Sequence, residues 1–210
     1  MICILIAEPL AIARKGLKQI LLEEFPLARI EEVNDPADII ARAQQSTPDL
    51  VISDIAMPGH YGLEILYAIR RKFPRLPVLI SSMYPEEQYA KRILGAGVNG
   101  YLSKQSTPYE LVCAIKSVLG GRKYITPKVA DKIIGDLLLG TEKLPHETLS
   151  DREFDIFKLL ARGKRVTEIA DLLGLSSSMV GNYRTRILAR LNLKSTAELI
   201  LYASRHNLTG

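Results

Sequence analysis

Four polar side chains stand at the ends of short apolar runs, and together they carry the chemistry of phosphoryl transfer onto a carboxylate. They are Glu8, Asp54, Ser82 and Lys104. Asp54 closes the run "LVISD" and is the candidate nucleophile, since a carboxylate can form a covalent intermediate. Lys104 and a divalent cation would neutralise charge on the transferring group, and Ser82 would then bind one of its oxygens. Any one of these could be a solvated loop residue, but four in a consistent order favour a shared site.

The four residues can meet only if the apolar runs are strands of one sheet. Short apolar runs alternate with helical patterns, the runs at 2–7, 28–33, 49–54, 77–82 and 98–103 and the helical patterns at 11–24, 36–46, 62–72, 86–95 and 108–119. This alternation predicts an α/β fold, a five-stranded doubly wound parallel sheet with helices on both faces. Ligands of such sheets bind beyond the carboxyl ends of the strands, where the four residues fall.

From residue 148 onward the pattern becomes helical throughout. A short helix is predicted over 166–174, where Gly174 ends it, and a longer basic helix follows over 175–191, with Ser176 as its N-cap. A short helix, a tight turn and a longer basic helix are typical of an all-α helix-turn-helix domain that binds DNA.

The two patterns are joined by a connector. We therefore expect an α/β domain over 1–122, a linker over 123–147 and a helix-turn-helix domain over 148–210. Within the linker, 126–140 is predicted to form one amphipathic helix, capped by Thr126 and ended by Gly140. The following residues, 141–148, read as a flexible linker.

The predicted helix over 177–191 has an apolar face, and its opposite face presents small and polar groups. The candidate DNA contacts are Ser178, Asn182, Arg184, Thr185, Arg186 and Arg190, with Lys164, Arg165 and Lys194 as further phosphate contacts. Asn182 could pair with adenine, and Arg186 with guanine or phosphate. Residues 176–210 carry five basic side chains against one acid, which favours a polyanion partner. The charge alone is equally typical of a solvated helix face.

Membrane and metal-cluster functions find no support in the sequence. No stretch of 18 apolar residues occurs, as a membrane-spanning helix would need. The opening "MICILIAEP" lacks a basic leader, so it reads as a buried strand rather than a signal peptide. Cys3 and Cys113 stand alone, as buried thiols of a reducing cytosol would, and the three histidines are scattered. We expect a cytoplasmic protein without a membrane partner.

The motifs "ILIAEP", "LVISDIAMPGHYGLE", "VLISSMY" and "GYLSKQ", followed by "LSDREFDIFKLLARGKRVTEIADLLGLSSSMVGNYRTRILARLNL", extend over almost the whole chain. They resemble a two-component response regulator of the NarL/FixJ group, with a CheY-like receiver domain and a LuxR-type helix-turn-helix domain. The resemblance implies that Asp54 is the phosphoacceptor, Ser82 the switch hydroxyl, Tyr101 the switch aromatic and Lys104 the conserved-type lysine. It also implies double-stranded DNA, a sensor histidine kinase or small phosphodonor, a second copy of the chain and RNA polymerase as partners.

The sequence departs from this family pattern in one place. The family usually has two adjacent acids after the first strand, and here the pair is Glu8-Pro9. Proline contributes no side-chain oxygen as a ligand and has no backbone N–H. The resemblance implies a Mg²⁺ site at Glu8, Asp54 and the backbone carbonyl of Ala56. We expect Mg²⁺ to bind this site at least about tenfold more weakly than a site with paired acids.

Three functions follow from these patterns. The first is a DNA-binding transcription regulator, not an enzyme, that is controlled by phosphorylation of Asp54. The second is an atypical regulator whose degenerate receiver, with Glu8-Pro9 in place of the acidic pair, leaves DNA binding largely independent of phosphorylation. The third is a small α/β phosphotransfer enzyme that uses Asp54, and the basic helical domain argues against it because it adds no catalytic group.

Overall fold

The computed structural model describes residues 1–57, 60–61, 64–84, 86–138 and 144–209. The contacts within the chain divide it into two compact units, one of residues 1–58 with 63–135 and the other of residues 136–210 with 59–62. The predicted division at residues 122 and 148 stays a prediction. No helix in the described part of the chain is long and apolar enough to cross a membrane.

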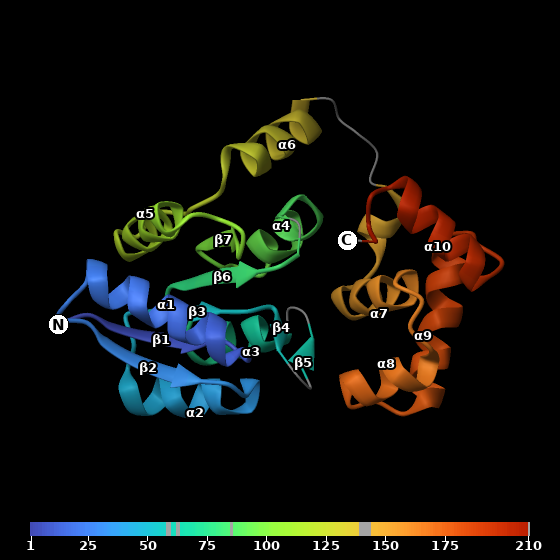
Figure 1. Cartoon of the computed structure of the whole chain (residues 1–210). Coiled ribbons are helices and arrows are strands. Elements are labelled where there is room, and N and C mark those ends of the chain that lie inside the picture. Colours follow the sequence, from blue (N-terminus) through green and yellow to red (C-terminus); the bar gives the residue numbers. More distant parts are fainter. Residues whose placement is uncertain (58–59, 62–63, 85, 139–143, 210) are drawn as a thin grey trace. The chain divides into compact units, whose positions relative to one another are not determined.

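The first unit is built on a five-stranded parallel sheet, as the alternating pattern predicts (Figure 1). Its strands, in spatial order, are β2 (Arg29–Val33), β1 (Cys3–Ala7), β3 (Leu50–Ser53), β6 (Val78–Ser82) and β7 (Gly100–Ser103). All four neighbouring pairs are parallel, so the carboxyl ends of the strands share one edge. β1, β3 and β6 are buried along their whole length, because helices cover both faces of the sheet.

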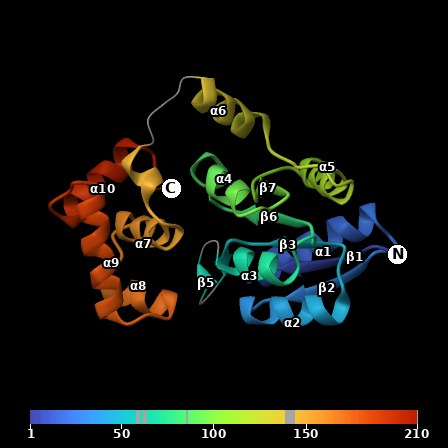
Figure 2. The ribbon, with the colours of Figure 1, turned by 180° about the vertical axis from the view of Figure 1, so that it is seen from behind.

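Five helices alternate with these strands, namely α1 (Ala11–Glu24), α2 (Pro36–Ser46), α3 (Glu64–Lys72), α4 (Glu86–Gly95) and α5 (Pro108–Leu119). Ile4, Ile6 and Leu102 point to the face that α1 and α5 cover, where Leu111 of α5 joins them in one core. α2 packs against β1 and β2, and α4 packs against β7. Figure 1 looks onto α1, and the reverse view in Figure 2 looks onto α3 and α4.

The second unit contains η1 (Pro145–Thr148), α7 (Asp151–Ala161), α8 (Val166–Leu173), α9 (Ser177–Arg190) and α10 (Thr196–Arg205). α8 ends at Gly174, whose φ of 63° is a left-handed conformation that glycine adopts without strain. Ser176 then caps α9, because its side chain accepts from the Met179 N–H. The predicted order of short helix, tight turn and longer helix is therefore confirmed.

Three short elements in the described part of the chain differ from the sequence prediction. Ala56–Met57 (β4) and His60–Tyr61 (β5) form a two-stranded sheet that the apolar pattern does not reveal, since each has only two residues. The flexible linker predicted over 141–148 is wrong for its last residues, which form η1. There Glu147 accepts from the Leu144 N–H, and the buried His146 ring lies 2.9 Å from the Tyr202 hydroxyl of α10.

The predicted linker helix is present as α6 (Pro127–Leu138). Its proposed stop, Gly140, lies outside the described residues. Val129 is buried while Leu138 is 81% exposed, so one side of the helix is covered and its far end faces solvent.

Candidate functional site

Three of the predicted residues meet at the carboxyl edge of the sheet. Glu8 follows β1, Asp54 follows β3 and Lys104 follows β7. Lys104 Nζ lies 2.6 Å from Glu8 Oε2 and 2.6 Å from Asp54 Oδ2. The two carboxylates are 1% and 6% exposed, and the lysine side chain is 11% exposed. The ammonium therefore sits between two buried carboxylates, as the strand order predicts.

The electrostatics of the site favour a charged lysine. Burial alone would lower the pKa of Lys104, but the hydrogen bonds and charges of Asp54 and Glu8 outweigh burial and raise it. An ammonium facing two carboxylates leaves one negative charge without compensation among the three. This net negative charge suits a nucleophilic carboxylate and can attract a divalent cation.

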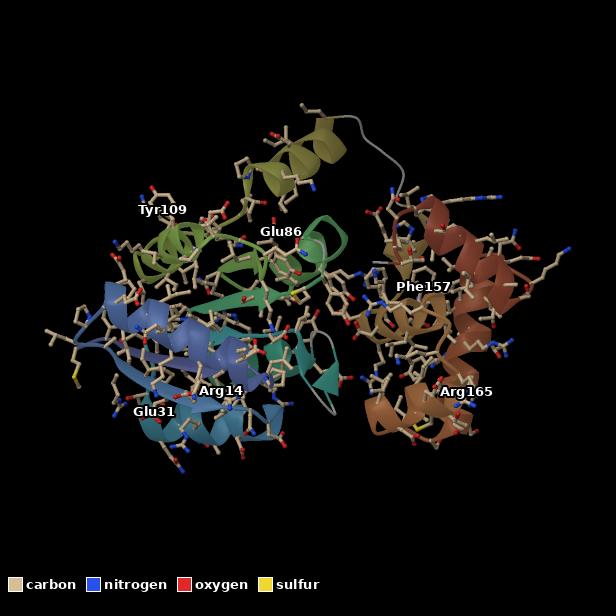
Figure 3. All side chains as sticks on the ribbon, viewed as in Figure 1. Arg14, Glu31, Glu86, Tyr109, Phe157 and Arg165 are labelled. Atoms are coloured by element: carbon tan, nitrogen blue, oxygen red, sulfur yellow. The ribbon has the colours of Figure 1, made fainter. Side chains whose placement is uncertain are left out.

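The loop that carries Glu8 is held by contacts that sequence reasoning missed. The Leu10 N–H donates to Glu8 Oε1 at 3.0 Å, and Arg14 Nη1 donates to the Glu8 carbonyl oxygen at 2.7 Å. Arg14 of α1, which is labelled in Figure 3, is itself paired with Glu32, at 3.4 Å. The Glu8-Pro9 turn is thus fixed from both its side chain and its backbone.

The donor set fits Mg²⁺, although it is sparse. No group of three acidic, histidine or cysteine side chains able to hold a metal occurs within the described ranges. Glu8 and Asp54 supply two carboxylates, and Mg²⁺ often binds through one or two carboxylates while it keeps several waters. Ala56, whose carbonyl was the third predicted ligand, lies two residues after Asp54 in β4. The predicted weakness of the site stays a prediction.

Ser82 and Tyr101 are joined through a residue that the sequence analysis did not select. Ser82 ends β6 and is fully buried, and its Oγ accepts from the Tyr84 N–H at 3.4 Å. The Tyr101 hydroxyl donates to the Tyr84 carbonyl oxygen at 2.7 Å. Burial raises the pKa of Tyr101, so this hydroxyl keeps its proton. Tyr84, which stacks on Tyr89 with ring centroids 5.1 Å apart, therefore connects the two predicted switch residues.

The outer face of α9 is exposed as predicted. Its exposed candidates are Ser178, Asn182, Thr185 and Arg186, while Val180 and Ile187 face the core. The Arg186 guanidinium lies 4.5 Å from the centroid of the Tyr183 ring. Arg184 is half-buried, and its Nε donates to Thr196 Oγ1 at 2.8 Å. The guanidinium of Arg184, a predicted DNA contact, is thus held at the start of α10.

The remaining basic candidates differ in their surroundings. Arg190 Nη1 lies 3.0 Å from Glu153 Oε2 and donates to the Thr148 carbonyl oxygen at 3.2 Å. A DNA contact by Arg190 would therefore compete with an ion pair inside the unit. Arg165 lies 3.4 Å from Glu168, on a largely exposed surface. Two further candidates, Lys164 and Lys194, are exposed.

Comparison with known proteins assigns both halves of the chain. The family described as "Response regulator receiver domain" matches residues 4–116, and the family described as "Bacterial regulatory proteins, luxR family" matches residues 147–203. The chain is 31% identical to the response regulator UvrY of Escherichia coli K12, over 99% of this chain and 96% of the relative. It is 32% identical to the oxygen regulatory protein NreC of Staphylococcus carnosus, over 98% of each chain.

Solved structures share the fold of the whole chain. The RcsB response regulator of Salmonella typhimurium has a TM-score of 0.74 at 22% identity, over 97% of both chains. A second RcsB structure, bound to promoter rprA in the presence of phosphomimetic BeF3⁻, has a TM-score of 0.69 over 97% of this chain and 99% of that chain. With an Asp–Lys–Glu cluster at the sheet edge and a helix-turn-helix unit at the other end of the sequence, the chain belongs to the response regulators, with a receiver domain joined to a LuxR-type DNA-binding domain.

Proposed function

We propose that phosphorylation of Asp54 controls how this response regulator binds DNA and thereby regulates transcription. The observation that carries the proposal is the 2.6 Å contact between Lys104 Nζ and Asp54 Oδ2 at the carboxyl edge of the sheet. A lysine at that place can pair with the carboxylate before transfer and with the phosphoryl group of the acyl phosphate after it.

The transfer itself makes one bond and breaks one. An oxygen of the Asp54 carboxylate attacks the phosphorus of a phosphohistidine or a small acyl phosphate, and the bond from phosphorus to the donor's nitrogen or oxygen breaks. Lys104 remains an ammonium and pairs with the new phosphoryl group, which keeps Glu8 from repelling it. Mg²⁺ held by Glu8, Asp54 and the Ala56 carbonyl would supply further charge neutralisation.

The acyl phosphate then changes the contacts of the switch residues. The Ser82 hydroxyl, which accepts from the Tyr84 N–H, would instead meet a phosphoryl oxygen. Because the Tyr101 hydroxyl donates to the Tyr84 carbonyl, a shift of Tyr84 would also shift Tyr101. Phosphorylation of Asp54 would thus shift Tyr101 of β7 through two hydrogen bonds, and Tyr89 of α4 through its stacking on Tyr84.

The expected partners follow from the family and from α9. We propose a sensor histidine kinase or a small phosphodonor for Asp54, double-stranded DNA for the exposed face with Asn182 and Arg186, and RNA polymerase at the promoter, all in the cytoplasm. Two copies of the chain would match two half-sites about one helical turn apart. A solved structure of two RcsB dimers bound to two parallel DNAs supports a dimer as the form that binds DNA.

Intact-mass measurement after treatment with acetyl phosphate, combined with binding to promoter DNA, tests the proposal. We expect one added phosphoryl group, tighter DNA binding after treatment, and loss of both in Asp54→Asn. Asp49→Asn, which changes a carboxylate at the opposite end of β3, is the control that should keep both. Phosphoryl uptake that persists in Asp54→Asn would overturn the assignment of Asp54. DNA binding that is equal with and without phosphate would instead support an atypical, phosphorylation-independent regulator.

A further inference from the structure

The edge of the sheet at β7 is covered by the segment that leads out of the receiver domain. Tyr124 forms a parallel bridge with Gly100. The Tyr124 N–H donates to the Asn99 carbonyl at 2.8 Å, and the Tyr101 N–H donates to the Tyr124 carbonyl at 3.4 Å. Tyr124 therefore adds a single β-bridge to the outer edge of β7 and pairs backbone groups that an edge strand otherwise leaves unpaired.

Gly100 is what permits this close approach. A Cβ atom at position 100 would lie 2.9 Å from Leu79 Cδ1 and 3.0 Å from the Tyr124 carbonyl oxygen. Both distances are shorter than non-bonded heavy atoms in contact normally have. A larger residue at position 100 would require Leu79 Cδ1 and the Tyr124 carbonyl to move away.

A single carboxylate ties the same segment to the site. Glu86, which is labelled in Figure 3, is the first residue of α4; it accepts from the Ser103 N–H at 3.1 Å with Oε1 and from the Thr126 hydroxyl with Oε2. Ser103 directly precedes Lys104, and Thr126 directly precedes α6. Glu86 thus joins the strand end that carries Lys104 to the start of the connector helix.

Tyr101 has one hydrogen bond toward each side of this junction. Its hydroxyl donates to the Tyr84 carbonyl, next to Ser82, and its backbone N–H donates to Tyr124. The bond to Tyr124 is long at 3.4 Å, so a small shift of Tyr101 would break it. A change at Ser82 therefore has a short physical route to the connector.

We infer that residues 123–126 form a docked connector segment whose release is coupled to the phosphorylation of Asp54, with Glu86 as the positioning residue that holds it. The inference rests on the proposed function. In the unphosphorylated protein the docked segment fixes the start of α6. When Ser82 turns to a phosphoryl oxygen, Tyr84 and Tyr101 shift and the connector segment loosens.

Hydrogen exchange of the Tyr124 amide in the full chain, with and without beryllofluoride and Mg²⁺, tests this coupling. We expect exchange at Tyr124 to rise at least tenfold with beryllofluoride. Thr126→Val should raise the exchange rate of the Tyr124 amide even without beryllofluoride. It should also reduce the difference in DNA affinity between the protein with beryllofluoride and the protein without it. Glu86→Gln, which retains an acceptor oxygen, should restore much of the protection that Glu86→Ala loses. Thr167→Val, at an exposed position of α8, is the matched control and should change neither measurement.

Separate outcomes distinguish the inference from the function on which it rests. If changes at Lys104 show that beryllofluoride loads the site while Tyr124 stays equally protected, the coupling is overturned and the proposed function stands. An absence of any change at Lys104 or in DNA affinity would overturn both. Gly100→Ala gives a second route to release of the segment, and protection of Tyr124 equal to the wild type in that variant would also contradict the inference.

Discussion

Lys104 Nζ lies 2.6 Å from Glu8 Oε2, so the acid that follows the first strand is already paired with a cation inside the chain. The same ammonium lies 2.6 Å from Asp54 Oδ2. In this resting state the lysine neutralises part of the charge that a divalent cation would otherwise meet. Lys104 therefore has two roles that can be separated by experiment, as support of a buried acidic pair and as a partner of the phosphoryl group.

Replacement of Lys104 by methionine should destabilise the receiver domain by about 3 kcal/mol, because two buried carboxylates lose the cation between them. The free energy of global opening, measured from hydrogen exchange of the β3 amides, reports this change. Addition of Mg²⁺ should recover part of the loss. Lys116→Met, which breaks an exposed pair with Glu24, is the control and should have little effect. Equal stability of Lys104→Met and the wild type would show that the carboxylates do not depend on the ammonium.

Replacement of Pro9 by aspartate should make Mg²⁺ binding about tenfold tighter, which corresponds to about 1.4 kcal/mol. A unit charge on the new aspartate, about 4 Å from the cation at an effective dielectric of about 20, would attract it by about 4 kcal/mol. Water molecules that the cation keeps in the unchanged protein already supply a part of this stabilisation. Titration followed by NMR shifts of the Lys104 region measures the affinity. Pro26→Asp, at an exposed position beyond the end of α1, adds the same charge elsewhere and serves as the control. Tight binding in the unchanged protein would mean that Glu8 alone replaces the acidic pair.

The meeting of Lys104 and Asp54 could be predicted from sequence because it depends only on topology. Right-handed β-α-β connections place all the carboxyl ends of parallel strands at one edge, whatever the details of the loops. The hold of Arg14 on the Glu8 carbonyl depends on the path of a turn, and the link through Tyr84 depends on backbone groups that any residue carries. The residue types in the sequence therefore do not reveal either contact.

Helix α9 also has some features that the sequence predicts and others that it does not. Helical periodicity predicts which side chains of α9 face solvent, and the exposed Asn182 and Arg186 agree with it. The pairing of Arg190 with Glu153 escaped prediction because the two residues are brought together by the packing of α9 on α7. The burial of His146 likewise depends on Tyr202, far along the chain.

Arg186→Ala should weaken operator binding by about 1–3 kcal/mol if the guanidinium reads a base. Its exposure and its position over the Tyr183 ring hold the guanidinium on the outer face of α9. The affinity for operator and for unrelated DNA should be measured across a range of salt concentrations. Arg205→Ala removes an equal charge from the exposed end of α10 and should have a smaller effect. A loss that is equal for all sequences, with a shallower salt slope, would assign Arg186 to phosphate instead.

Arg190→Ala should destabilise the DNA-binding unit by about 1 kcal/mol through loss of its pairing with the buried Glu153 carboxylate. Burial alone would raise the pKa of Glu153, but the Ser150 hydrogen bonds and the nearby arginines outweigh it and lower that pKa. A carboxyl with a depressed pKa stabilises the fold above its unfolded pKa, and that contribution is lost as the pH falls through the folded pKa. The difference between wild type and variant should therefore shrink below about pH 4, with exchange of α7 amides as the measurement. A difference that persists unchanged at low pH would show that Arg190 acts by packing.

Gly181→Ala should change stability and DNA affinity in opposite directions. A Cβ atom at position 181 meets nothing within 4 Å, and alanine is favoured over glycine inside a helix, so α9 should become more stable by about 1 kcal/mol. The new methyl group would stand on the outer face beside Asn182, where the backbone of a recognition helix approaches the bases, and operator affinity should fall severalfold. Gly135→Ala in α6 also meets open space and should leave DNA affinity unchanged. Exchange of α9 amides and operator titration on the same samples separate the two effects. If operator affinity stays at the wild-type value while the helix gains stability, the backbone at Gly181 does not lie against DNA, and the glycine has no role in recognition.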